Sequence, residues 1–129
     1  MRLDVLADAL SAIKNAEAVG KKECIVRPVS KLVREVIKMM KDRGYLEDYE
    51  YIENKRGGAI KVKLWGRINE CKAIKPRFPC KLEEIEKYEQ RFLPARGFGF
   101  LIISTPKGLM TNDEAKKKGM GGVLIAYVY

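Results

Sequence analysis

Apolar positions recur at helical spacing in two segments of the first half of the chain. In the first segment they lie three or four residues apart, at Leu3, Leu6, Leu10 and Ile13, which predicts an amphipathic helix of about 12 residues. Asp4 is expected in the first turn of this helix, where a carboxylate favours the helix dipole.

The second helix is expected to open at Pro28 and Ser30 and to end at Gly44. Its apolar stripe has five members at helical spacing: Leu32, Val33, Val36, Ile37 and Met40. One face of each helix is therefore expected to be buried.

Short apolar or alternating runs predict three strands in this half. A short strand is expected over residues 23–27, and the runs 49–52 and 60–64 flank a turn cluster at residues 54–58. The two flanking runs predict a β-hairpin with one buried face. The expected order of the first half is thus α-β-α-β-β.

The second half has weaker helical periodicity and more turn residues. Two prolines exclude a central strand over residues 74–79, so this segment is expected to be an ordered basic arm or loop. The other expected elements are a short strand over residues 67–73, a short acidic helix over 82–88, a loop over 94–97, the strongest strand over 98–104, a turn over 106–108 and a last strand over 123–129.

One further short helix is expected between the turn and the last strand. Thr111 and Glu114 have the spacing of a capping box, and Gly119 is expected to end the helix. In the last strand, simple alternation places Leu124 on one face and Tyr127 on the other.

Together these elements predict an α+β fold of two small packed domains. Residues 1–65 are expected to form the α-β-α-β-β domain, and residues 66–129 a β-rich domain with a short helix. No apolar run approaches the roughly 20 residues that a membrane span needs, and Asp4 stands where a secretory signal would be apolar. We therefore expect a cytoplasmic protein with no membrane partner.

Composition points to a polyanionic partner. The 129 residues include 26 Lys and Arg and 17 Asp and Glu, for a net charge of +9. Both halves share the excess, and acidic stretches over residues 45–54 and 82–90 interrupt it. Any single charged run is best explained as a solvated face, but the pattern as a whole, in a basic folded chain, favours nucleic acid. The acidic stretches also fit a protein-interaction module.

The residue inventory limits the chemistry. There is no histidine, which excludes Ser-His-Asp and Cys-His catalysis and most zinc sites that use histidine. Cys24, Cys71 and Cys80 are odd in number and lack CxxC spacing. We expect no metal, no cofactor and no small-molecule substrate. An enzyme with Lys107 or Ser104 as nucleophile would lack an acid–base partner.

The most informative candidate site is the turn that begins at Ser104. Ser104 and Thr105 supply hydroxyls that can donate to phosphate or accept from bases, and Gly108 allows close backbone approach. An ordinary Ser/Thr turn is the alternative. Gly121 and Gly122 lie between a helix and a strand, the reverse of a dinucleotide-binding loop, and fit a tight turn with close backbone approach.

Several segments form one ordered pattern across nearly the whole chain. They are residues 3–10 with Ile13 and Asn15, residues 28–32 with Gly44 and Tyr45, residues 73–79, residues 93–96, Ser104 and Thr105 with Gly108, Met110, Thr111, Glu114 and Ala115, and Gly121 and Gly122 with Leu124 and residues 126–129. In this order they resemble the universal small-subunit ribosomal protein S-eight family. Residues 73–79 and 93–96 resemble its archaeal and eukaryotic branch.

The resemblance implies a structural protein, not an enzyme, that binds the central domain of small-subunit rRNA and supports assembly of the subunit. It implies neighbouring small-subunit ribosomal proteins as further partners, and a C-terminal loop that meets irregular bases in the RNA minor groove. The residues implied for RNA binding are Ser104, Thr105 and Gly108 in the reading loop, Lys107 as a phosphate contact, Gly121 and Gly122 as a close-approach turn, the N-terminal residues Asp4, Ser30 and Lys31, and the basic residues Arg96, Lys75 and Arg77.

Three positions depart from the family's pattern. Pro106 stands where the loop usually carries a third hydroxyl residue, Val123 stands where bacterial members carry an acid, and Val5 stands where a proline is common. Side-chain contacts from the first two positions are therefore not implied. The sequence leaves one alternative open, a free-standing RNA-binding translational regulator, whose partners would include its own mRNA.

Overall fold

The structure is a computed structural model of the chain, and it describes residues 4–27, 29–53 and 58–129. The chain divides into two compact units, Met1–Cys71 and Lys72–Tyr129. Leu3, Pro28 and the turn residues 54–57, for which the sequence predicted helix or turn positions, lie outside the described residues. The domain boundary expected after residue 65 stays a prediction.

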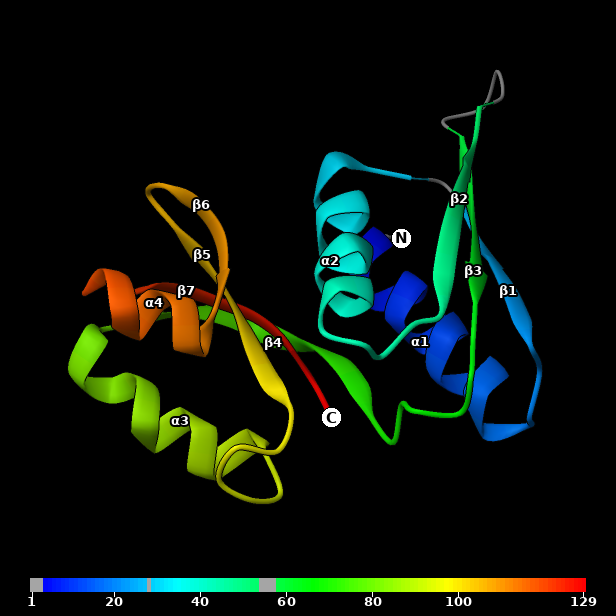
Figure 1. The fold of residues 1–129 in the computed structure, drawn as a ribbon. Coiled ribbons are helices and arrows are strands. Elements are labelled where there is room, and N and C mark those ends of the chain that lie inside the picture. The colour runs from blue at the N-terminus through cyan, green and yellow to red at the C-terminus, as the bar shows by residue number, and fades with distance from the viewer. Residues whose placement is uncertain (1–3, 28, 54–57) are drawn as a thin grey trace. The chain divides into compact units, whose positions relative to one another are not determined.

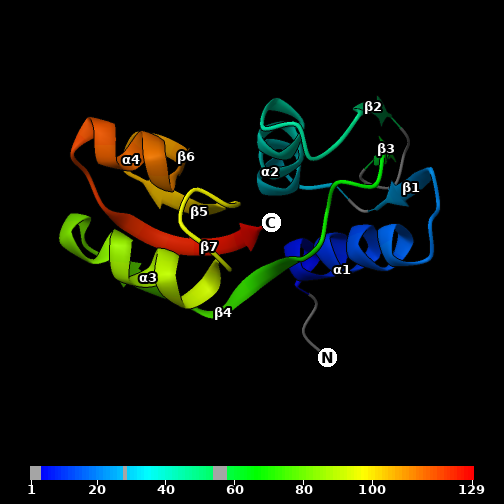
Figure 2. The same ribbon diagram turned by 60° about the horizontal axis from the view of Figure 1, so that its bottom comes forward.

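The first unit has the expected order α-β-α-β-β. Its elements are α1 (Val5–Ala18), β1 (Glu23–Val26), α2 (Lys31–Asp42), β2 (Asp48–Ile52) and β3 (Ala59–Lys63). The sheet order is β1-β3-β2, with both outer strands antiparallel to β3. Both helices lie on one side of this sheet (Figures 1 and 2). The expected hairpin is confirmed, and its buried residues come from β3, whereas β2 is largely exposed.

Side-chain caps explain where the two helices of the first unit begin. An Asp4 carboxylate oxygen accepts the Ala7 N–H at 3.0 Å, and the Ser30 hydroxyl oxygen accepts the Val33 N–H at 3.2 Å. Because α1 starts at Val5, Asp4 is its N-cap rather than a residue of its first turn. Both polar side chains thus have a structural role that the helical periodicity alone did not define.

The second unit is a four-stranded sheet with helices packed on it. Its elements are β4 (Cys71–Cys80), the 3₁₀ helix η1 (Leu82–Glu84), α3 (Ile85–Phe92), β5 (Phe100–Thr105), β6 (Gly108–Thr111), α4 (Asn112–Lys118) and β7 (Gly122–Val128). The sheet order is β4-β7-β5-β6. The expected α+β fold class is therefore confirmed.

All four strands of this sheet contribute apolar side chains to one core with α3 and α4. Figure 1 shows both helices on the same side of the sheet. The buried members of the core are Ile74, Cys80, Ile85, Tyr88, Leu93, Leu101, Ile103, Met110, Ala115 and Leu124. The opposite face of β5 carries the alternate residues of the strand, including Ser104.

The expectation of an arm or loop over residues 74–79 is wrong, because these residues lie within β4. This strand is at the edge of its sheet, beside β7. Proline has no N–H to donate to a neighbouring strand. An inner strand is paired on both sides, whereas an edge strand has one unpaired side, so Pro76 and Pro79 are tolerated in β4. The prolines thus excluded only a central position. The strand expected over residues 67–73 begins at Cys71 instead.

The sequence did not predict β6. Only two residues separate it from β5, and Thr105 pairs with Gly108 across the turn. The expected turn is therefore the tip of a β-hairpin. The capping box of Thr111 and Glu114 is confirmed at the start of α4, where the Thr111 hydroxyl accepts the Glu114 N–H at 3.3 Å.

A bulge overturns the expected faces of the last strand. Ile102 pairs with Ala126 but Ile103 pairs with Leu124, so one residue of β7 is left over between them. An extra residue reverses the alternation beyond it. Leu124 and Tyr127 therefore pack against the same helix-side core, not on opposite faces.

Candidate nucleic-acid interface

The turn between β5 and β6 is shaped by the hydroxyl of Thr105. This hydroxyl donates to the Gly108 carbonyl oxygen at 2.7 Å and accepts the Lys107 N–H at 3.2 Å. Thr105 is buried, with 7% of its surface exposed. Its one proton is committed inside the turn, so Thr105 positions its neighbours instead of donating to a partner.

Ser104 and Lys107 are the polar side chains that this turn leaves accessible. Ser104 is half-buried and alternates with Ile103, which packs in the helix-side core, so Ser104 faces the other side of the sheet. Lys107 is exposed at the hairpin tip. Gly108 has a φ of +112°, a conformation that favours glycine. The turn therefore presents one hydroxyl and one ammonium group from a fixed backbone.

Gly121 and Gly122 approach the backbone of this same chain. A Cβ at Gly122 would overlap the Ser104 carbonyl group, and a Cβ at Gly121 would overlap the Cys80 carbonyl oxygen and crowd the Leu82 nitrogen. The close approach expected from the sequence thus has a structural cause inside the sheet. Gly122 also supports the backbone on which Ser104 lies.

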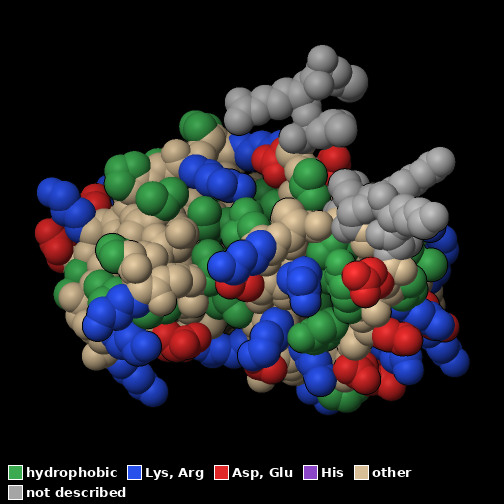
Figure 3. Space-filling view, turned by 90° about the horizontal axis from the view of Figure 1, so that it is seen from above, with side chains coloured by type: hydrophobic (Ala, Val, Ile, Leu, Met, Phe, Trp, Pro, Cys, Tyr) green, Lys and Arg blue, Asp and Glu red, His purple; other side chains and the backbone are tan. Residues whose placement is uncertain are grey.

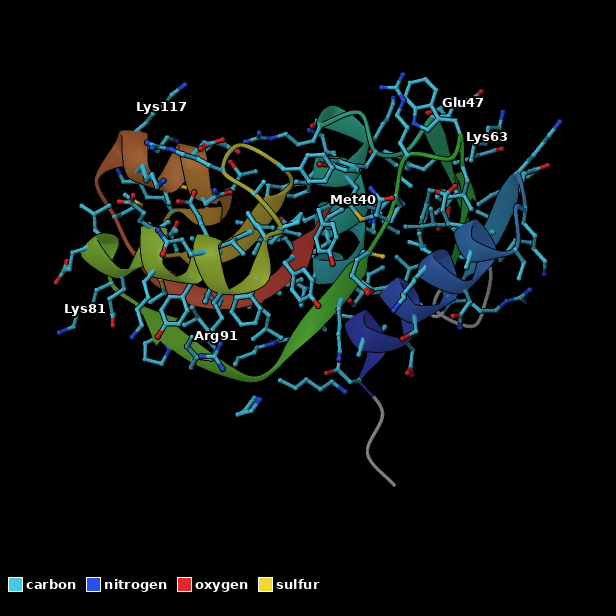
Figure 4. The ribbon with its side chains drawn as sticks, turned by 90° about the horizontal axis from the view of Figure 1, so that it is seen from below. Met40, Glu47, Lys63, Lys81, Arg91 and Lys117 are labelled. Atoms are coloured by element: carbon cyan, nitrogen blue, oxygen red, sulfur yellow. The ribbon has the colours of Figure 1, made fainter. Side chains whose placement is uncertain are left out.

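Exposed lysines surround the hairpin end of the sheet. Lys81 follows the end of β4 beside Gly121, and Lys117 and Lys118 lie on the last turn of α4 just before that glycine. Figure 4 shows the labelled Lys81 and Lys117 at the same end of this unit. Lys116 differs, because its ammonium group pairs with Glu89 at 2.6 Å.

Arg96 lies away from the turn. It precedes the N-terminal end of β5, whereas the turn follows the C-terminal end. Six strand residues span about 20 Å at roughly 3.4 Å each. Arg96 also lines a hollow of about 500 Å³ with the acidic residues Glu86, Glu89 and Asp113, so its surroundings are mixed in charge.

The other residues predicted for RNA binding are spread over both units. Lys75 and Arg77 are exposed on the edge strand β4, two strand positions from β5. In the first unit, Asp4 and Ser30 cap helices, and Lys31 is exposed at the start of α2. Within the second unit, the structure thus brings Ser104, Thr105, Lys107, Gly108, Gly121 and Gly122 together and leaves Lys75, Arg77 and Arg96 apart from them.

Charged side chains are dispersed over the face of the molecule that Figure 3 shows. On the face shown in Figure 3, lysine and arginine side chains are interspersed with acidic and hydrophobic ones, and no single basic patch covers that face among the described residues. Charge on this face can attract a polyanion in general, but it does not by itself mark a binding site.

Comparison with known proteins decides the family. A family model described as Ribosomal protein S8 matches residues 4–129. The protein named "Small ribosomal subunit protein uS8" from Archaeoglobus fulgidus is 55% identical over 129 residues, and the alignment covers all of both chains. A protein of the same name from Methanococcoides burtonii is 54% identical over 127 residues, or 98% of each chain. The chain belongs to the ribosomal protein S8 family.

In this S8 family member, the cysteines are held as thiols of low reactivity. Cys71 donates to the Leu10 carbonyl oxygen at 3.3 Å, and burial, with the adjacent charge of Glu70, raises the pKa of its thiol to about 12. Burial also raises the pKa of Cys24 and of Cys80. A raised pKa leaves less thiolate, which is the reactive form. Cys71 and Cys80 are buried in the core, whereas Cys24 is half-buried.

Sequence reasoning missed two features of the site in this S8 family member. It treated Ser104 and Thr105 as equivalent hydroxyls, and it did not single out Lys81. Alternation along the strand does not separate the two hydroxyls, because residues 100–103 are all apolar and all buried, so both faces of the strand look alike. Lys81 lies far from the turn in sequence, so only the packing of Gly121 against the end of β4 reveals it.

No helix in the described residues is long and apolar enough to cross a membrane.

Proposed function

We propose that the chain is a structural constituent of the small ribosomal subunit that binds directly to the central domain of small-subunit rRNA and supports assembly of that subunit. It acts by binding, without catalysis, in the cytoplasm, with rRNA and neighbouring ribosomal proteins as partners. Membership of the S8 family supports this proposal, as do the relatives named as small ribosomal subunit proteins.

The observation that carries the proposal is the fixed turn at the end of β5. Thr105 closes the turn internally, so Ser104 and Lys107 project from a backbone that needs no ordering on binding. The minor groove of A-form RNA is wide and shallow and displays 2′-hydroxyls and base edges. A narrow hairpin tip with few charges can enter this groove, while the lysines around it meet phosphates.

The two accessible side chains have different roles in this proposal. Ser104 supplies a hydroxyl that exchanges hydrogen bonds with a base edge or a 2′-hydroxyl, which gives specificity. Lys107 neutralises a phosphate, which gives affinity that depends on salt concentration. Gly108 and Gly122 keep the turn in position, and they need no direct contact with RNA.

Binding of two serine variants to RNA tests this proposal. Ser104→Ala should weaken binding to the cognate rRNA helix about tenfold, the loss expected for one hydrogen bond of about 1.4 kcal/mol, and should leave binding to a random duplex unchanged. Ser11→Ala, on the exposed side of α1, is the matched control and should have no effect. Equal losses on both RNAs would exclude Ser104 as a specificity residue.

The salt dependence of binding tests the role of Lys107. Lys107→Gln should lower affinity for both RNAs and reduce the slope of log affinity against log salt concentration by about 0.7–0.9. An unchanged slope would contradict a phosphate contact.

Sedimentation of the native protein separates the ribosomal role from a free-standing regulator, because a regulator would leave most of the protein outside small subunits.

A further inference from the structure

A groove lies between the edge strand β4 and α3, away from the hairpin turn. It has a volume of about 360 Å³ and is lined by residues of β4, by Tyr88, Arg91 and Phe92 of α3 and by Tyr127 of β7. This volume falls within the range of about 300–1,000 Å³ typical of small-ligand sites. All of its lining residues belong to the second unit.

Aromatic rings form one wall of the groove. Tyr88 and Phe92 lie on successive turns of α3. The Phe92 ring also packs beside the Tyr127 ring, with 5.4 Å between the ring centroids and an angle of 25° between the ring planes. The Phe78 ring of β4 packs on the Tyr88 ring, with 5.0 Å between their centroids. Phe78, Phe92 and Tyr127 are only partly buried, although they pack on the core of the unit. Part of this apolar surface is therefore open to a ligand.

The charged residues that line the groove are basic. They are Lys72 and Lys75 of β4 and Arg91 of α3, all exposed, and none of the described lining residues is acidic. The guanidinium group of Arg91 lies 5.3 Å from the Phe92 ring centroid. Figure 4 shows the labelled Arg91 between α3 and β4. Cations beside aromatic surface are the combination that binds an unpaired nucleotide, because the base stacks while the phosphate pairs with the cations.

We propose that this groove binds one unpaired nucleotide of an RNA strand, with its base against Phe92 and Tyr127 and its phosphate at Lys72 and Arg91. The inference deepens the proposed function, because it adds a single-stranded contact to the duplex contact of the turn. The chemistry of the groove selects this occupant, because the exposed cations Lys72 and Arg91 favour an anion and the rings favour a flat base.

Binding of a single-stranded oligouridine by the full-length chain tests the groove. Arg91→Gln should weaken this binding on the order of tenfold, and Phe92→Leu, which keeps an apolar side chain but removes the flat ring, should weaken it by a similar factor. Lys22→Gln is the matched control, because it removes one positive charge from an exposed position of the first unit that does not line the groove. It should change affinity little. Equal losses for Arg91→Gln and Lys22→Gln would overturn the proposal, since they would indicate general electrostatic attraction.

Crosslinking locates the contact independently of these variants. A 4-thiouridine-labelled oligouridine should crosslink to peptides that contain Phe92 or Tyr127, and Ser104→Ala should not change that pattern. Crosslinks confined to other peptides would overturn the proposal. Failure of the groove is distinguishable from failure of the proposed function: if Arg91→Gln keeps its affinity for oligouridine while the wild type still binds the rRNA helix specifically, only the groove is refuted.

Discussion

The hairpin turn and the β4–α3 groove belong to the same unit, yet they are formed by different kinds of residue. The turn is built on small polar residues and glycines, and its shape is set by hydrogen bonds between the Thr105 hydroxyl and the backbone. The groove consists of large rings and long basic side chains whose shape is set by core packing. The turn can discriminate between base edges because its atoms are fixed, whereas the groove can accept any base because every base has a flat face.

The difference shows how the net charge of +9 relates to recognition. Charge supplies attraction that falls with salt and is indifferent to sequence. The turn adds a directional hydroxyl with one lysine, and the groove adds stacking with three cations. Variants that damage one region and spare the other therefore test whether the turn and the groove act separately.

Gly122→Ala should have the largest effect and should act on the turn. The added Cβ would overlap the Ser104 carbonyl group and lie 3.0 Å from Ile103 Cγ2, and a paired strand cannot move aside cheaply. We expect the free energy of unfolding to fall by about 3 kcal/mol and specific rRNA binding to be lost. Gly108→Ala is the control, since it has open space and only its φ is strained, which costs about 1 kcal/mol. Urea unfolding measures both, and equal losses would contradict the steric explanation.

Asn112→Ala should have the next largest effect and should act on the groove. The Asn112 side chain accepts the Leu101 N–H at 3.0 Å and donates to the Glu89 carboxylate, which holds α3 against α4 and β5. Its loss leaves a buried N–H unpaired, which costs about 2 kcal/mol. Because α3 carries rings of the groove, oligouridine binding should weaken more than rRNA-helix binding.

Lys116→Ala is the control for this variant. It removes only the exposed ion pair of Lys116 with Glu89, which contributes at most about 1 kcal/mol. A loss of stability as large as that of Asn112→Ala would show that the ion pair, and not the Asn112 hydrogen bonds, holds α3 in place.

Thr105→Val should have a smaller effect, confined to the turn. Valine keeps the shape of the side chain but removes the bonds to Gly108 and Lys107, which should cost about 1.5 kcal/mol. Thr105→Ser keeps the hydroxyl and should behave nearly as the wild type.

Ser104→Ala should reduce specific binding without reducing stability. If Ser104→Ala were the destabilising variant and Thr105→Val were neutral, the assigned roles would be reversed. Unfolding and RNA-binding assays on the same variants decide the matter.

Local signals were sufficient for the elements that local forces define. Ser30 and the pair Thr111 and Glu114 marked helix starts because a cap is bonded within three residues. Long-range pairing was not visible in the same way. The bulge opposite Ile102 depends on how two distant strands meet, and the segment containing Pro76 became a strand because it lies at a sheet edge.

The candidate site shows the same limit. The residue types in the turn and the family resemblance located it, but residues 100–103 are apolar on both faces of the strand, so alternation does not indicate which of the two hydroxyls is buried. The hydrogen bonds that commit the Thr105 hydroxyl are local, but they form only once β6 pairs with β5, which the sequence did not predict. The Lys81 position depends on the contact between Gly121 and the end of β4.

Ionisation of Cys71, the first residue of β4, should have the smallest effect on stability and should leave the turn and the groove intact. Its folded-state pKa is raised to about 12 from a usual value of 9.0. Above pH 9 the unfolded thiol loses its proton while the folded one keeps it, so the unfolded state is favoured as pH rises. This should lower the free energy of unfolding by about 1 kcal/mol between pH 9 and pH 10. Urea unfolding of the wild type and of Cys71→Ala isolates this contribution, because other titrating groups are shared. The difference in stability between the two proteins should shrink as pH rises, and a constant difference would mean that the buried thiol ionises as readily as an exposed one.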